Sequence, residues 1–282
     1  MDVLNSKILH STLALLGSAL GMAATPSMAQ CLSAPPNLVE AGYLTVGTSL
    51  TAPPMGFMKD DTPSGFDPEF ITAVAEKMCL KTKIVNVTFQ GLFPGLIAKK
   101  FDVIASQIGI TDPRKEMFDF VPVFVGGLRL VTQKNSGLKF QTESDVCGHA
   151  ASIVAGSTQM AALERVKGDC PAGKPMTLKV FTNQSEALNE VAKGTVNVAY
   201  VDWPVAAYLI QQRPQDFVEA SPVLSGKGPN TERNRNGIVI RKGETPTQDA
   251  VAAAVKAAMS AGAYDEILKK WNLADGDVRK AN

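Results

Sequence analysis

The segment "FDVIASQIGITDPRKEMFDF", residues 101–120, predicts the fold and directs attention to one side chain. Its opening part, FDVIASQI (101–108), is apolar almost throughout, which is typical of a β-strand that is covered on both faces. The apolar run breaks at Thr111, Asp112 and Pro113, and one arginine, Arg114, follows. We therefore predict a buried strand that runs into a charged loop and presents a guanidinium there.

Strands and helices alternate on both sides of this segment. The predicted strands cover 43–50, 82–89, 128–134, 151–156, 178–183, 196–202 and 236–243. The predicted helices cover 68–79, 91–100, 158–167, 184–194, 204–212, 246–261 and 263–271. Asp67 is placed to cap the first of these helices. The alternation implies parallel sheets covered by helices, and the length favours two α/β lobes over one large sheet.

Residues 1–29 are predicted to be a cleavable secretory signal peptide. Lys7 precedes an apolar run over 8–24, and small residues flank a cleavage point after Ala29. A retained membrane anchor is the alternative, although the run is short for a bilayer span. Lipid attachment at Cys31 is a second alternative, but the residue before it is a glutamine. We therefore expect an exported protein.

Charge and cysteine content set further limits. The net charge is +1 with no basic block, so nothing indicates binding to nucleic acid or to an anionic membrane surface. An even number of cysteines in an oxidising compartment suggests disulfides, and the four allow three pairings. Cys147 and Cys170 flank a strand, helix and turn, so we favour that bridge, with Cys31–Cys79 as the second. A zinc site is not expected, because the sequence has no CxxC pair.

No catalytic or cofactor motif stands out. Beyond residue 29, His149 is the only histidine, and the cysteines are predicted to be oxidised, which leaves little for Ser-His-Asp or Cys-His chemistry. The GxGxxG and GxxxxGK[ST] patterns are absent, so we expect no nucleotide cofactor. We also expect no metal, because His149 stands alone and the sequence has no CxxC pair. What remains is a set of polar residues at the carboxyl ends of predicted strands, where ligands bind in open α/β sheets.

Several motifs carry a resemblance to one family. They follow one another in the order LTVGT (44–48), GFDPEF (65–70), the long segment 91–120, VAGSTQ (154–159), VNVAYVDWPVAAYLI (196–210), NGIVIRKGE (236–244) and AYDEILKKWNL (263–273). From about Leu44 to Leu273 the chain resembles the family 3 solute-binding proteins. These are periplasmic receptors of ABC importers for polar amino acids and opines.

The resemblance implies a two-lobed α/β fold of the periplasmic-binding-protein type (type II), in which each lobe has a central sheet flanked by helices. Two hinge crossings would join lobe 1, residues 38–128 plus 238–282, to lobe 2, residues 129–237. The lobes would close over an amino acid or an opine-like derivative and deliver it to an inner-membrane ABC permease. The protein would then be a monomeric binding protein and not an enzyme.

The resemblance also assigns roles to the two charged residues at strand ends. Arg114 matches the arginine that grips the ligand's α-carboxylate, and a guanidinium can do this with two parallel charge-assisted hydrogen bonds. The plain alternative is a surface arginine. Asp202 matches the acid that takes the α-amino group. Its alternative is a helix cap before Trp203 and Pro204.

The other implied ligand contacts are weaker one by one. Thr158 matches a hydroxyl donor at a helix N-terminus, where free N–H groups favour a carboxylate, and an ordinary cap is the alternative. Phe89 matches an aromatic ring that stacks on the ligand, and a core position is its alternative. Ser106 and Gln107 would offer mainly backbone groups. The complete predicted ligand-binding set is Arg114, Asp202, Thr158, Phe89, Ser106, Gln107, Gly109, Ser49, Ala52 and Ser157.

Departures from the family pattern bear on the ligand. Gly109 stands where many members have Ser or Thr, so it can give only its N–H. Ala52 replaces a common aromatic residue and Met55 a common phenylalanine, which predicts extra room unless Met55 fills it. Ser49 stands where receptors for basic side chains often have Asp, and Val154 aligns near the side-chain pocket. We therefore expect little fixed charge there, and a ligand with a neutral or larger side chain.

Two other functions were weighed. Periplasmic amino-acid dehydratases of the arogenate or prephenate type resemble these receptors, but their chemistry needs an acid or base beside the substrate. The predicted pocket offers none beyond Asp202, which would hold the amino group. A sensor lobe of a signalling receptor is the third possibility, and it would need a transmembrane segment after the domain.

Overall fold

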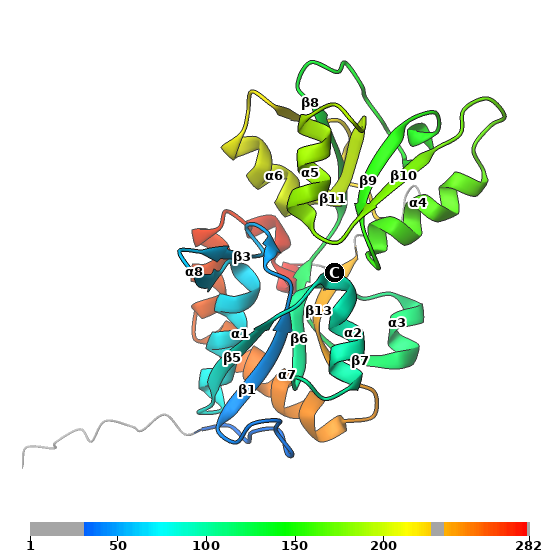
Figure 1. Cartoon of the computed structure of the whole chain (residues 1–282). Helices are drawn as coiled ribbons and strands as arrows, with labels where there is room; N and C mark the ends of the chain where they lie inside the picture. The colour runs from blue at the N-terminus through cyan, green and yellow to red at the C-terminus, as the bar shows by residue number, and fades with distance from the viewer. Residues whose placement is uncertain (1–30, 227–233, 281–282) are drawn as a thin grey trace, which may run out of the picture. The chain divides into compact units, whose positions relative to one another are not determined.

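The structure is a computed structural model that describes residues 31–226 and 234–280 (Figure 1). The predicted signal peptide, residues 1–29, lies outside the described residues. Within the described ranges, no helix has both the length and the apolar character needed to cross a membrane. The described residues belong to one compact unit that begins at Cys31.

The first sheet has five strands in the order β5–β1–β6–β13–β7. These strands are β1 (Tyr43–Thr48), β5 (Lys81–Asn86), β6 (Val103–Gly109), β7 (Phe118–Val125) and β13 (Arg235–Arg241). β6, which begins two residues inside the predicted 101–108, lies in the middle of the sheet, as the apolar run predicts. Its side chains alternate between two cores. Val103 and Ala105 lie in one core, and Ile104 and Ile108 lie in the other.

Helices cover both faces of this first sheet. On one face pack α1 (Phe66–Lys77), α7 (Thr245–Ser260) and α8 (Ala263–Lys270), and on the other packs α2 (Leu92–Ile97). The residues after β6 form a six-residue helix, α3 (Asp112–Met117), with Pro113 near its start. The prediction of a loop there was wrong, because proline is well tolerated in a first helical turn.

The second sheet repeats this plan with the order β10–β9–β11–β8–β12. Its strands are β8 (Leu128–Gln133), β9 (Ala150–Val154), β10 (Thr177–Phe181), β11 (Val198–Asp202) and β12 (Phe217–Glu219). One face packs against α4 (Thr158–Gly168), and the other against α5 (Gln184–Ala192) and α6 (Trp203–Gln212). We call the part built on the first sheet lobe 1 and the part built on the second sheet lobe 2.

Each sheet is mixed, although the alternation of strands and helices predicted parallel sheets. In lobe 1 only β13 runs against its neighbours, and in lobe 2 only β8 does. Both are strands by which the chain enters a lobe from the other one. They start at the carboxyl ends of the neighbouring strands, where Leu128 pairs with Asp202 and Asn236 pairs with Gly109. The crossings therefore lie at the edge of each sheet where ligands bind in α/β proteins.

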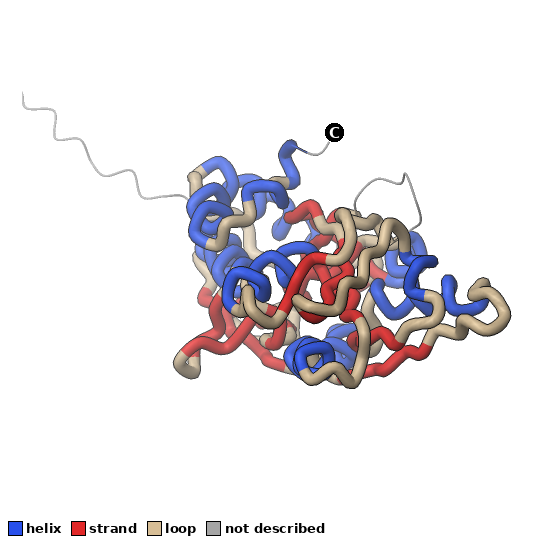
Figure 2. Tube along the Cα trace, turned by 90° about the horizontal axis from the view of Figure 1, so that it is seen from above, coloured by secondary structure: helices blue, strands red, loops and turns tan. Residues whose placement is uncertain are grey.

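Smaller elements complete the described chain, and Figure 2 colours them by type. A three-stranded sheet consists of β2 (Thr51–Ala52), β3 (Gly56–Lys59) and β4 (Thr62–Ser64). The 3-10 helices are η1 (Phe89–Gly91), η2 (Glu143–Val146), η3 (Ala274–Gly276) and η4 (Val278–Lys280). The small sheet matters here because β2 reaches lobe 2. The Oγ of Ser185 donates to the carbonyl oxygen of Thr51 at 3.3 Å.

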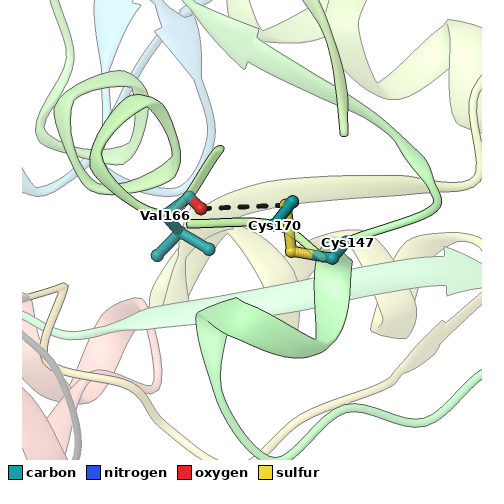
Figure 3. Close-up of a disulfide and its surroundings, with 3 residues drawn as sticks. All are labelled: Cys147, Val166 and Cys170. Atoms are coloured by element: carbon teal, nitrogen blue, oxygen red, sulfur yellow. Dashed lines mark hydrogen bonds between the residues drawn. A yellow bond between two sulfur atoms is a disulfide. The ribbon is translucent and has the colours of Figure 1, made fainter. Parts of the chain in front are cut away.

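Both predicted disulfides are confirmed. Cys31 is bonded to Cys79 and Cys147 to Cys170, with Cα–Cα distances of 5.6 and 5.5 Å. Figure 3 shows the second bridge beside the end of α4, where Cys170 Sγ lies 3.7 Å from the carbonyl oxygen of Val166. It fastens α4 to the segment that follows η2.

Candidate ligand-binding site

One pocket takes its lining from both lobes, at the carboxyl ends of their strands. Lobe 1 contributes Ser49, Thr51, Ala52, Met55, Gly56, Asp67, Phe89, Ser106, Gln107, Gly109 and Arg114. Lobe 2 contributes Val154, Ser157, Thr158, Gln159, Gln184 and Asp202. The space between these atoms, counted out to the solvent at the mouth, is about 560 Å³.

The structure brings all ten sequence-predicted ligand-binding residues to this pocket. Lobe 1 supplies seven of them from five places: Ser49 after β1, Ala52 in β2, Phe89 in η1, Ser106, Gln107 and Gly109 in β6, and Arg114 in α3. Lobe 2 supplies Ser157 and Thr158 at the start of α4 and Asp202 at the end of β11. Their shared location follows from the fold, since the carboxyl ends of strands in both lobes face the crossings.

Arg114 is held by backbone carbonyls of both lobes. Its Nη1 donates to the carbonyl oxygen of Gly109 at 2.8 Å, and its Nη2 donates to that of Gly156 in lobe 2 at 3.1 Å. The guanidinium also lies over the ring of Phe93, 5.0 Å from the ring centre. Burial lowers the pKa of Arg114 to about 10, while the charge of Asp202 acts to raise it. The side chain is therefore positively charged at neutral pH.

Asp202 accepts a hydrogen bond from within its own lobe. Gln159 Nε2 donates to its carboxylate at 2.7 Å. Asp202 is the N-cap residue of α6 by position, but its carboxylate makes no capping hydrogen bond. Burial raises the pKa of Asp202 to about 7, against the lowering effects of Gln159 and Arg114. This carboxylate can therefore change its protonation state in the physiological pH range.

At the start of α4, the residue that caps the helix is not the one whose hydroxyl was predicted to bind the ligand. Ser157 is the cap, and its Oγ accepts a hydrogen bond from the backbone N–H of Met160 at 3.1 Å. Thr158 is the first helical residue, and its hydroxyl contacts Gln159 Oε1 at 3.2 Å. The capping role that was the alternative for Thr158 thus belongs to Ser157. The Thr158 hydroxyl remains on the pocket wall.

Gly109 lies against lobe 2. A Cβ atom at this position would come within 3.2 Å of Thr158 Cγ2 and 3.7 Å of Arg114 Nη1. A serine or threonine here would therefore crowd the start of α4. The missing side chain allows β6 to approach Thr158 closely.

The remaining predicted residues of lobe 1 also have structural partners. Ser106 Oγ accepts from the backbone N–H of Ser49 at 3.0 Å, so this hydroxyl links β6 to the end of β1. Gln107 has a positive φ of 52°, and its carbonyl oxygen accepts from Asn236 Nδ2 at 3.2 Å. Phe89 is partly buried and packs against the core that includes α2, so it both lines the pocket and belongs to the core.

Asp67 was assigned wrongly. The sequence predicted a helix cap, but Gly65 holds that position, the helix begins at Phe66, and no side chain caps it. Asp67 instead lies on the pocket wall with 7% of its surface exposed. Burial raises its pKa to about 8, with a further increase from Asp202 and a decrease from the backbone N–H of Gln107.

Gln159 and Gln184 are also pocket residues that the predicted set lacks. The motifs GFDPEF and VAGSTQ contain Asp67 and Gln159, so the signal was present, but their residue types alone do not distinguish a cap from a pocket wall. Among the described residues, no three His, Cys, Asp or Glu side chains gather closely enough to hold a metal ion.

Two α/β lobes that share a pocket lined by opposite charges form the kind of architecture used by small-molecule-binding proteins. The family model of the bacterial extracellular solute-binding proteins, family 3, matches residues 44–274. The chain therefore belongs to this family.

Individual comparisons agree with this membership. The chain is 28% identical over 239 residues to the L-cystine-binding protein TcyA of Bacillus subtilis, which covers 83% of each chain. Among solved structures, an ancestral arginine-binding protein bound to arginine is 29% identical, with a TM-score of 0.74 over 82% of this chain and 98% of the other. The ancestral amino-acid-binding protein AncCDT-1, a precursor of cyclohexadienyl dehydratase, is 26% identical with a TM-score of 0.70, over 82% and 95% of the two chains.

Proposed function

We propose that this protein is the substrate-binding component of an ABC importer and that it binds an amino acid or amino-acid derivative between its lobes. The observation that carries the proposal is the pair of opposite charges in one pocket, Arg114 from lobe 1 and Asp202 from lobe 2. The α-carboxylate of the ligand would bind the Arg114 guanidinium, and its α-ammonium would bind the Asp202 carboxylate. The names of the relatives, which bind L-cystine and arginine, support an amino-acid ligand.

The same pair of charges explains why a ligand would close the lobes. A zwitterion can contact Arg114 and Asp202 together only when the lobes are close to each other. It therefore binds the closed form better, and this differential affinity drives closure. We place lobe 1 at residues 38–128 plus 238–282 and lobe 2 at 129–237, bounds that fall within β8 and β13, the strands that follow the two crossings.

The cellular setting follows from the family, whose members are extracellular or periplasmic. We propose that residues 1–29 are a cleaved signal peptide and that the mature protein acts in the periplasm, where its disulfides are stable. It would work there as a monomer that docks on an inner-membrane permease, without nucleic acid and without catalysis of its own. The ligand class includes opine-like derivatives, because the Ala52 and Met55 positions were expected to leave room.

The test is ligand binding by purified protein that has been unfolded and refolded to remove co-purified ligand. A thermal-shift screen of amino acids and opines should reveal the ligand, because 100 times the dissociation constant stabilises by about 2.7 kcal/mol. Arg114→Ala should weaken that ligand by about 100-fold or more in calorimetry, and small-angle scattering should no longer show ligand-induced compaction. Unchanged affinity in this variant would disprove the carboxylate assignment.

The dehydratase alternative gains one observation from the structure. Asp67 is a second buried carboxyl group in the pocket, with a pKa near neutrality, and an elimination reaction needs such an acid or base. Turnover of arogenate or prephenate by the pure protein, absent in Asp67→Asn, would establish the enzyme. Binding without turnover supports the receptor.

A further inference from the structure

We propose that Asp67 recognises a second positively charged nitrogen group at the far end of the ligand, so that the ligand class is amino acids with a cationic amine, ammonium or guanidine beyond the α-carbon head group. This inference rests on the proposed function, because it assumes that the α-carboxylate and α-ammonium occupy Arg114 and Asp202.

The position of Asp67 is fixed by its backbone. It lies in the first turn of α1, its backbone N–H donates to the carbonyl oxygen of Met55 at 2.8 Å, and its side chain lines the pocket while being more than nine-tenths buried. The backbone N–H of Gln107 is the hydrogen-bond donor that acts on its carboxylate. No ion pair to Asp67 exists among the described residues that line the pocket, where Arg114 is the only cationic side chain.

The charges of the pocket favour a cationic ligand group. Its described lining has two carboxylates, Asp67 and Asp202, and one guanidinium, Arg114. A zwitterionic head group satisfies Arg114 and Asp202 and adds no net charge, which leaves Asp67 as an unpaired buried acid. A buried charge is costly unless it is paired. Burial raises the pKa of Asp67 to about 8, so its carboxyl group can hold a proton at neutral pH that a cationic ligand would displace.

The wall around Asp67 suits the stem of a long side chain. Met55, Asp67 and Gln107 line the pocket and also a second, smaller cavity behind it. That cavity is lined mainly by apolar side chains, among them those of Phe66, Phe70, Ile71, Val123 and Phe124. The buried Nε2 of Gln107 has no hydrogen-bond partner in the described part of the chain, so this wall has a second polar group available to a ligand. Methylene groups would pack against Met55 while the terminal nitrogen meets Asp67.

The position of Asp67 also revises the expectation from sequence. Ser49 led us to expect little fixed charge for the ligand's side chain, and a serine does stand there on the pocket wall. The acidic group is instead supplied from α1, by Asp67, which the sequence had predicted to be a helix cap.

The experiment compares ligands that differ in this nitrogen group, by calorimetry on the refolded protein. L-arginine is paired with L-citrulline and L-lysine with L-norleucine, and L-cystine is included because it carries a second ammonium group. The cationic member of a pair should bind at least about 10-fold more tightly, in line with the strength of hydrogen bonds to charged groups. Asp67→Asn should remove that preference, and the parent protein should release more protons on binding than the variant does.

Matched variants keep the outcomes separate. Glu76→Gln removes the same charge from the exposed side of α1 and should leave the preference intact, while circular dichroism checks that each variant is folded. If a neutral ligand binds as well as its cationic partner, or if Asp67→Asn keeps the preference, the Asp67 assignment is wrong while binding that depends on Arg114 still supports the receptor. If Arg114→Ala has no effect on any ligand, the proposed function itself fails.

Discussion

Two buried carboxyl groups and one guanidinium give this pocket its chemical character at the scale of single residues. Asp202 has a pKa raised from its ordinary value of 3.8 to about 7, because burial disfavours its charged form. Two pH effects of opposite sign follow. Protonated Asp202 stabilises the free fold, whereas under the proposed function ionised Asp202 would bind a ligand ammonium group.

The first prediction concerns the pH dependence of affinity. Ligand affinity should fall as the pH drops below about 7, approaching 10-fold per pH unit for this group, because an ammonium pairs only with ionised Asp202. Asp202→Asn should bind more weakly at pH 8 and lose this part of the slope between pH 5 and 7. Calorimetry across pH measures both effects. An identical slope in parent and variant would rule out Asp202 as the titrating group.

The pH dependence of folding stability has the opposite sign to that of ligand affinity. The folded-state pKa of Asp202 lies above the unfolded value, so the folded protein holds more protons between about pH 4 and 7. This group's contribution to the stability of the free protein is therefore fully present below pH 4 and is lost as the pH rises through 7. Under the proposed function, the site gives up stability for a charge that the ligand would use.

The second prediction concerns Gly109. Gly109→Ala should weaken ligand binding by about fivefold, equivalent to about 1 kcal/mol, because its Cβ would press on Thr158 Cγ2 across the pocket. Thr158→Ser removes that methyl group and keeps the hydroxyl. The double variant Gly109→Ala with Thr158→Ser should therefore recover the affinity of Thr158→Ser alone. Failure of this recovery in calorimetry would show that the contact does not limit closure.

Sequence reasoning located most of the site but not all of its chemistry. The ten residues that the family resemblance implied all line one pocket, and the apolar runs had indicated the strands at whose ends several of them lie. Asp67 was not predicted as a pocket residue, because an aspartate before a proline is equally typical of a helix cap. Only the structure, in which α1 begins at Phe66, rules out the cap. The tight approach of Gly109 to Thr158 joins residues far apart in the chain, and such a distance is not encoded in any local pattern.

At the scale of elements, periodicity predicted which segments are strands and helices but not the direction of every strand. Alternation of strand and helix implies parallel pairing, and this holds for β1 with β5 and for β9 with β10. β8 and β13 run the other way because each follows a crossing between lobes instead of a helix that packs on its own sheet. That reversal depends on the path of the chain between lobes, which local residue patterns do not report.

The third prediction concerns the two disulfides. Cys147→Ala with Cys170→Ala should lower the free energy of unfolding by about 3 kcal/mol on the chain-entropy model. It should also weaken ligand binding, because this bridge fastens the end of α4, whose first residue is Thr158 on the pocket wall. Chemical denaturation and calorimetry measure the two effects.

The other bridge provides the control. Cys31→Ala with Cys79→Ala should lower stability but leave affinity unchanged, because neither cysteine lines the pocket. Equal losses of affinity in the two double variants would mean that the disulfides act only on global stability.

At the scale of the whole molecule, the two lobes differ in how the chain builds them. The described strands of lobe 2 come from one continuous stretch, 128–219, whereas the sheet of lobe 1 needs β13 from after that stretch. β13 lies between β6 and β7, so these two strands are connected in the sheet only through β13. Lobe 1, which supplies part of the charged pocket, therefore depends on two segments of the chain, one before lobe 2 and one after it.

The central place of β13 sets the order in which the two sheets can be completed. All strands of lobe 2 precede β13 in the chain, and β13 joins the two halves of lobe 1's sheet, so that sheet cannot be completed until residues 235–241 are available. A chain that stops at residue 226 should give slow hydrogen exchange in β9 and β11 but fast exchange in β6 and β7. Protection of β6 and β7 in that truncated chain would show that lobe 1 can fold without its late strand. The sheet of lobe 1 is thus completed after that of lobe 2, so the pocket that both lobes line can form only once β13 is in place.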